Sequence, residues 1–141
     1  MRVKADVEIL EQVALFAGCD KTHLQILAFS STRVQLPEGR VLFKKGTNGA
    51  AGFVVLEGEA NLFDDVHGVS NLVARIAGRE FLGELSMITD AAYTVTVRAA
   101  TELAAQRIDR ELFLRVAAEF PEFSLKVMKN LSSKLDRSVA Q

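Results

Sequence analysis

The chain has 141 residues, 49% of them hydrophobic, and its 17 basic and 18 acidic side chains leave a formal net charge of −1. This length fits one domain, the apolar fraction excludes a disordered chain, and the scattered basic residues argue against nucleic acid as the main partner. Cys19 is the only cysteine, which excludes an intrachain disulfide and a cysteine-ligated iron–sulfur cluster.

The N-terminal part of the chain favours two short helices over about 6–29. Asp6 is placed to cap the first helix, and Asp20 is placed to cap the second. His23 falls in the first turns of that second helix, where we expect a surface or capping role. The first twelve residues lack the apolar segment of a signal peptide, and no run approaches the roughly 18 apolar residues of a membrane span. We therefore expect a cytoplasmic protein with no membrane partner.

From about Thr32 the apolar pattern changes to short runs that are separated by turn signals. The runs are TRVQL, RVLFKK, GFVVLEG, EANLFD, NLVARIA, TVTVRA and ELAAQRI, and the turns include PEG, GTNG, Glu57–Gly58 and DDVHG. A spacing of roughly 8–12 residues predicts about eight strands over about 32–108, which is typical of an all-β sandwich or barrel. Helices do not alternate with these strands, so a parallel α/β sheet is not expected.

The C-terminal part returns to a helical pattern over about 110–138. Asp109 can cap a first helix, and Pro121 suits the first turn of a second one. One face of the last helix is apolar, and it consists of Ser124, Met128, Leu131 and Leu135, with Val127 and Val139 beside them. This face packs either on its own barrel or on a second copy of the chain, and the sequence leaves both alternatives open. We expect one domain over residues 1–141.

This arrangement resembles the cyclic nucleotide-binding domain of CRP/FNR regulators, of cyclic-nucleotide-dependent kinases and of ion channels. Gly39, Gly46 and Gly58 fall where that family places turn glycines, within LPEGRVLFKKG and GFVVLEGEANLF. The resemblance extends from about Leu10 to Leu135. It implies a mainly β fold, an eight-stranded antiparallel jelly-roll barrel with short helices before it and two helices after it.

The stretch FLGELSMITDAAYTV carries the second part of the resemblance, the phosphate-binding cassette. Gly83, Glu84, Leu85 and Ser86 match the first half of the family motif. The resemblance implies that free N–H groups after Gly83 face a phosphate, as they do at the start of a helical turn. It also implies that Glu84 accepts hydrogen bonds from a sugar hydroxyl.

The second half of the cassette departs from the family. Tyr93 stands nine residues after Glu84, where the family has the arginine that pairs with the cyclic phosphate, whereas Thr94 fits the neighbouring small-residue position. A phenol carries no charge, so this change weakens phosphate binding by roughly ten- to a hundred-fold and puts cyclic AMP binding in question. Arg75 or Arg79 could replace the missing charge, and the sequence does not show whether either does.

The resemblance implies a non-catalytic regulatory or sensor domain, with cyclic AMP, cyclic GMP or a related phosphorylated compound as possible ligand. The residues that would hold it are Gly83, Glu84, Leu85, Ser86, Tyr93 and Thr94. The alternative is a ligand-free interaction or dimerisation module that uses its C-terminal helix to bind a second copy or another protein. His23 and His67 are isolated, and no catalytic motif is present, so neither a metal site nor a catalytic residue is expected. Because no helix-turn-helix follows the last helix, we expect no direct DNA binding.

Overall fold

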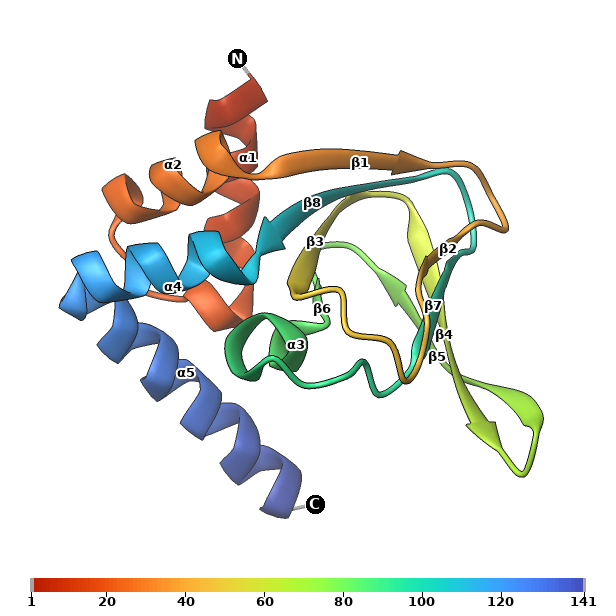
Figure 1. The fold of residues 1–141 in the computed structure, drawn as a ribbon. Coiled ribbons are helices and arrows are strands. Elements are labelled where there is room, and N and C mark those ends of the chain that lie inside the picture. Colours follow the sequence, from red (N-terminus) through yellow and green to blue (C-terminus); the bar gives the residue numbers. More distant parts are fainter. Residues whose placement is uncertain (1, 141) are drawn as a thin grey trace.

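The computed structural model describes the main chain of residues 2–140 and the side chains of residues 5–133. A helical layer lies to one side of a β-sandwich (Figure 1). The layer contains α1 (Arg2–Gln12), the short 3₁₀ helix η1 (Ala14–Phe16), α2 (Lys21–Ser30), α4 (Arg110–Glu119) and α5 (Pro121–Ala140). Within this part of the chain, no helix is both long enough and apolar enough to cross a bilayer.

The strands form two four-stranded antiparallel sheets, with the orders β1-β8-β3-β6 and β2-β7-β4-β5. They are β1 (Thr32–Leu36), β2 (Val41–Phe43), β3 (Ala51–Glu57), β4 (Glu59–Val66), β5 (Val69–Ala77), β6 (Phe81–Leu82), β7 (Thr96–Ala99) and β8 (Leu103–Asp109). The predicted eight-stranded jelly roll is therefore confirmed. The two-residue β6 was not anticipated, because such a short run carries no alternation. The cassette helix α3 (Glu84–Thr89) joins β6 to β7.

The first sheet is covered on both faces, which explains why β3 reads as a continuous apolar run. Phe53 and Val55 point between the sheets, whereas Val54 packs against the helical layer. A helical-side core forms around Phe16 and Phe123, whose rings stack at a centroid distance of 6.0 Å. The space between the sheets forms a separate core, and the cassette closes one end of it.

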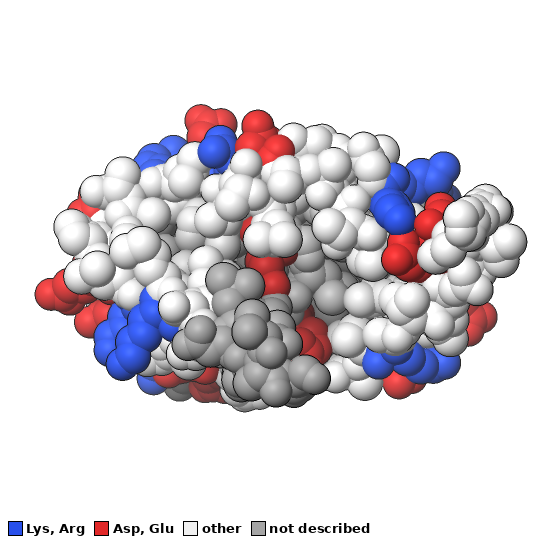
Figure 2. Space-filling model, turned by 90° about the horizontal axis from the view of Figure 1, so that it is seen from below, with Lys and Arg blue, Asp and Glu red and all other residues white. Residues whose placement is uncertain are grey.

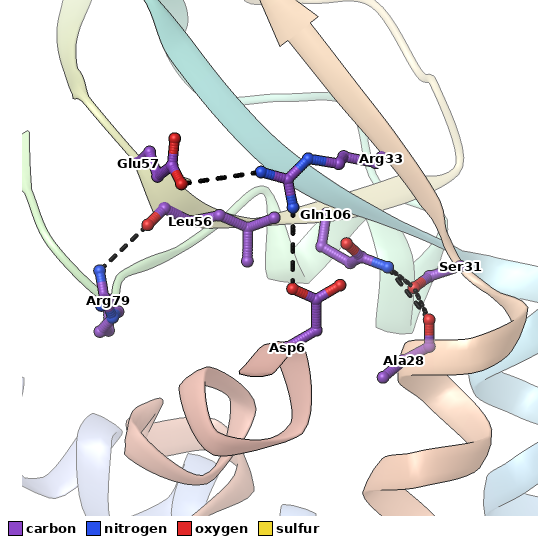
Figure 3. A network of polar contacts seen from close by, with 8 residues as sticks. All are labelled: Asp6, Ala28, Ser31, Arg33, Leu56, Glu57, Arg79 and Gln106. Carbon is purple, nitrogen blue, oxygen red and sulfur yellow. Dashed lines mark hydrogen bonds and ion pairs between the residues drawn. The ribbon is translucent and has the colours of Figure 1, made fainter. Parts of the chain in front are cut away.

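The predicted cap at Asp6 is wrong, because α1 begins earlier, at Arg2. Asp6 lies inside this helix with 5% of its surface exposed, and its carboxylate is 3.7 Å from a guanidinium nitrogen of Arg33 on β1 (Figure 3). Arg33 also reaches Glu57, at 3.8 Å. The predicted cap at Asp20 is confirmed, because its carboxylate accepts a 2.8 Å hydrogen bond from the N–H of Thr22.

Further polar contacts fasten the helical layer to the first sheet (Figure 3). The buried amide of Gln106 on β8 donates to the carbonyl oxygen of Ala28, at 3.2 Å, and to the hydroxyl of Ser31. These bonds hold the end of α2 on the sheet. They also explain how a polar residue fits a strand that is otherwise apolar on this face.

The start of the C-terminal helices agrees only partly with the sequence. Pro121 begins α5 as predicted. Asp109 occupies the N-cap position of α4 but makes no capping hydrogen bond, because its carboxylate accepts one from Arg107 at 2.8 Å instead. The surface role predicted for His23 is wrong: only 9% of its surface is exposed, and its ring centroid lies 4.4 Å from that of Phe120.

The apolar face of α5 is divided between two environments. Val127 is buried, and Leu131 packs at the edge of the helical core. The hydroxyl of Ser124 donates to the carbonyl oxygen of Ala117 on α4. Met128 points outward, with 57% of its surface exposed. Two predicted members of this face, Leu135 and Val139, lie outside the described side chains. The helix thus packs on its own domain and still presents apolar surface to the outside.

Candidate ligand site

The structure brings the predicted cassette residues together around one small cavity of about 100 Å³. Its lining consists of Phe43, Gly83, Glu84, Leu85, Ser86, Ala92, Tyr93, Thr94 and Val95. Gly83 precedes α3 with a φ of 75°, a left-handed conformation that glycine adopts without strain. Small-molecule pockets usually measure about 300–1,000 Å³, so this cavity is too small for a nucleotide as it stands.

The Tyr93 ring fills the mouth of the β-sandwich. Its surface is 5% exposed, and the ring lies nearly parallel to that of Phe43, at a centroid distance of 3.9 Å and an angle of 17°. Its hydroxyl crosses to β3 and donates a 2.8 Å hydrogen bond to the carbonyl oxygen of Ala51. The one donor that this side chain could offer a phosphate is therefore already bound inside the protein.

Two glycines make room for the ring. A Cβ atom on Gly83 would lie 2.8 Å from the Cε1 atom of Tyr93, and a Cβ atom on Gly49 would lie 2.7 Å from the Tyr93 hydroxyl oxygen. Both distances are shorter than real contacts of Cβ atoms. The close approach of two backbone segments thus shapes the space around the phenol.

The loop between β2 and β3 holds the main chain on both sides of Tyr93. The Tyr93 N–H donates to the Thr47 carbonyl oxygen at 2.9 Å, and the Gly46 N–H donates to the Tyr93 carbonyl oxygen at 2.8 Å. The Asn48 amide donates to both the carbonyl and the carboxylate oxygen of Asp90 at the end of α3, each at 2.8 Å. Hydrogen bonds from this loop therefore fix the cassette at Tyr93 and at Asp90.

Asn48 also contacts Ser86 of the cassette. That buried hydroxyl donates a 3.1 Å hydrogen bond to the Asn48 Oδ1 atom, which in addition accepts the N–H of Ala50 at 2.9 Å. Sequence reasoning used GTNG only as a turn signal and missed this role. An asparagine between two glycines was the available clue, because its amide both donates and accepts.

The environment of the phenol keeps it neutral. Burial raises the pKa of the Tyr93 hydroxyl above its ordinary value, against opposing contributions from a hydrogen bond with Ser86 and from the positive charge of Arg107. Arg107 lies on β8, where its guanidinium donates to the Gly49 carbonyl oxygen at 3.1 Å and stands 5.7 Å from the ring centroid of Phe53. This cation near the sandwich mouth was not predicted from the sequence.

The arginines that could replace the missing charge have other contacts. Arg75 pairs with Glu59 at 2.9 Å, and Arg79 donates to the Leu56 carbonyl oxygen at 3.0 Å. Neither of them lines the Tyr93 cavity. Arg79 instead borders a separate cavity of about 280 Å³ between η1, β6 and α5, which Glu84 also touches.

Histidine, cysteine and acidic side chains do not gather in the described part of the chain. It contains no group of three or more histidine, cysteine or acidic side chains placed to hold a metal ion. His67 lies in the turn between β4 and β5, with a φ of 52°. The face in Figure 2 shows basic side chains in separate groups near its edges, interspersed with acidic ones, and no continuous basic stripe.

Comparison with known proteins gives concordant results. A lysophospholipase of Neurospora crassa is 32% identical over 108 residues, which cover 76% of this chain but 7% of that protein. A CRP-like cAMP-activated global transcriptional regulator of Mycobacterium tuberculosis is 25% identical over 132 residues, which cover 93% of this chain and 59% of the regulator. The chain therefore spans only part of these relatives.

A solved structure has the same architecture. The N-terminal domain of a transcriptional regulator from Streptomyces coelicolor superimposes with a TM-score of 0.83 at 27% sequence identity, covering 92% of this chain and 94% of that domain. The family model for the cyclic nucleotide-binding domain matches residues 33–120, which include the whole cassette. With this match and the geometry above, the chain belongs to the cyclic nucleotide-binding domain family.

Proposed function

We propose that this protein is a regulatory domain whose nucleotide site is closed by its own Tyr93 side chain. In this proposal the domain does not report cyclic AMP by the usual cassette, and it acts through contacts with other protein surfaces. The main observation in support of this proposal is the buried Tyr93 ring, which stacks on Phe43 and whose hydroxyl bonds to Ala51, in the space between the cassette and the sheet.

Size and charge both support the closed site. The remaining cavity of about 100 Å³ is small for a nucleotide, and no described lysine or arginine lines it. A cyclic phosphate placed there would be desolvated with no cation in the cavity lining, because the guanidinium of Arg107 lies outside the lining and is bound to the Gly49 carbonyl oxygen. One relative is named as a cAMP-activated regulator, and a structural neighbour is a kinase regulatory domain solved with cAMP, which supports a regulatory role for the domain. The closed site argues that the signal received by this domain is not cyclic AMP.

Thermal unfolding with and without cyclic AMP and cyclic GMP tests the proposal. A compound that binds the folded state must raise the midpoint, so a millimolar excess is expected to leave it unchanged. The matched variant is Tyr93→Arg, which restores the family's charge and removes the phenol. If the unchanged protein binds cyclic AMP at micromolar concentration, the proposal is wrong.

A second candidate function is a sensor in which a different phosphorylated ligand displaces the Tyr93 ring. The observation that favours it is that Glu84 and Ser86 still line the cavity beside Gly83. In that case a panel of nucleotides contains at least one that raises the midpoint of the unchanged protein. Such a ligand is also expected to expose the tyrosine and alter its fluorescence, whereas an ion that binds elsewhere leaves the phenol buried.

A further inference from the structure

The loop between β2 and β3 contacts two parts of the molecule that are far apart in the chain, the cassette and the start of α4. Within the described part of the chain, every hydrogen bond that residues 85–95 make to another segment goes to residues 46–51. We call residues 46–51 the bridging segment. In Figure 1 it leads from β2 to the beginning of β3, beside α3 and beside the junction of β8 with α4.

Asn48 forms the cassette end of this connection. Its Nδ2 atom donates to two oxygen atoms of Asp90, and its Oδ1 atom accepts both the Ser86 hydroxyl and the Ala50 N–H. A side-chain amide has two donor hydrogens and one acceptor oxygen with two lone pairs, so these contacts use all of its capacity. A shift of α3 therefore acts on Asn48 and, through the bond to its N–H, on Ala50.

The carbonyl group of Ala50 forms the other end. It accepts a 2.7 Å hydrogen bond from the N–H of Arg110, the first residue of α4. The first N–H groups of a helix have no acceptor within the helix, and Ala50 supplies one from outside. The pairing of Ala51 with Asp109 keeps the two chain segments side by side at this point.

Ala50 is also strained. Its φ is 48°, a left-handed value that is unfavourable for a residue with a Cβ atom. Such residues persist only where the surrounding structure holds them, and they gather at sites that switch or bind. Here the N–H is held by Asn48 and the carbonyl oxygen is held by Arg110. The strain indicates that the conformation of Ala50 depends on both contacts.

We propose that the bridging segment couples the cassette to α4 and that the two contacts meet at Ala50. A movement of the cassette that releases Asn48 lets Ala50 relax, and the relaxation withdraws the acceptor from the Arg110 N–H. Because coupling between two sites is reciprocal, a partner that shifts the start of α4 also loosens the cassette around Tyr93. This inference goes beyond the proposed function, since it applies whether Tyr93 or a ligand fills the cassette.

Arg110→Pro tests the coupling from the helix end. Proline deletes the N–H that donates to Ala50 and suits the first position of a helix. The preceding residue, Asp109, has φ −70° and ψ 146°, which a following proline tolerates. Arg110→Ala is the matched control, because it removes the same side chain and keeps the N–H.

Amide hydrogen exchange measured by NMR is the readout. The reporter is the Tyr93 N–H, which donates to Thr47 in the bridging segment, and the reference is the Ala105 N–H, in a strand paired on both sides. Relative to Ala105, Arg110→Pro is expected to speed exchange at Tyr93 about three- to tenfold over Arg110→Ala, as for one lost hydrogen bond. Equal exchange at Tyr93 in the two variants would overturn the inference.

Asn48→Ala tests the coupling from the cassette end and decides the question alone if Arg110→Pro does not fold. It is expected to speed exchange of the Arg110 N–H about three- to tenfold relative to Ala105. The control is Asn71→Ala, because the Asn71 amide bonds only within its own hairpin, to Val69. An Arg110 N–H that responds equally to both variants, or to neither, would refute the coupling. These outcomes leave the nucleotide melting test unaffected, so the two proposals can fail separately.

Discussion

The hydroxyl of Tyr93 donates a hydrogen bond of 2.8 Å to the main-chain carbonyl oxygen of Ala51, across the mouth of the sandwich. This bond joins the end of the cassette to the first residue of β3. A side chain of the protein thus connects the cassette to the first sheet, and the contribution of this contact can be measured as stability.

Tyr93→Phe is expected to lower the free energy of unfolding by about 0.5–1.5 kcal/mol. The variant keeps the stacking on Phe43 and removes only the hydroxyl, so the change reports the bond to Ala51. Urea unfolding at neutral pH measures it, and an unchanged slope with denaturant shows that the fold is intact. Equal midpoints for the two proteins would mean that the bond contributes no net stability.

Gly49→Ala tests whether the ring and the loop between β2 and β3 are packed as closely as the structure shows. The new Cβ atom would lie 2.7 Å from the Tyr93 hydroxyl oxygen but 3.2 Å from the nearest ring carbon. Overpacking of this kind costs about 1–3 kcal/mol.

The cost of Gly49→Ala is expected to fall in the Tyr93→Phe background, because the nearest atom is then absent. A double-mutant cycle by urea unfolding gives the coupling, which is expected to be at least about 0.5 kcal/mol. Additive effects of the two substitutions would contradict this packing.

The sequence was sufficient for the fold because its signals are local. Turn glycines such as Gly58, with a φ of 88°, and alternating apolar runs mark the strands without reference to distant residues. The cassette residues 83–86 and 93–94 were likewise predicted, and the structure places them around one cavity. Asp6 was misassigned because a cap and a buried ion pair use the same residue type, and Arg33 lies far along the chain.

The side-chain contacts within the site could not be predicted, because they join segments that are distant in the sequence. The count from Glu84 located Tyr93 but did not show that its ring would stack on Phe43, fifty residues earlier by subtraction. Asn48 bonds to Asp90 of the cassette, and Arg107 bonds to Gly49 beside it, across the antiparallel pairing of β8 with β3. Each of these side chains has several possible partners in the sequence, and only the sheet register selects among them.

Cys19 is expected to react slowly with alkylating agents in the folded protein. Burial raises the pKa of its thiol to about 11, although the positive charge of Lys126 acts in the opposite direction. Because the thiolate is the reactive form, the folded protein is expected to react with iodoacetamide about a hundredfold more slowly than the unfolded chain at the same pH. Lys126→Gln is expected to slow the reaction further. A folded rate equal to the unfolded rate would show that the thiol is freely exposed.

Stability is expected to fall at alkaline pH through the Tyr93 phenol. Because burial raises its pKa in the folded state, the unfolded chain loses this proton at a lower pH than the folded protein does. Deprotonation therefore stabilises the unfolded state relative to the folded state as the pH rises. The contribution is fully present below the ordinary tyrosine pKa of about 10 and is lost as the pH rises through the folded value.

Tyr93 is the only tyrosine of the chain, so phenolate absorbance follows its titration directly. Urea unfolding of the unchanged protein should show a steeper loss of stability above this pH than Tyr93→Phe does. Parallel losses in the two proteins would assign the alkaline unfolding to other groups, and a phenolate signal that appears at the ordinary pH in the folded protein would show that the ring is not buried.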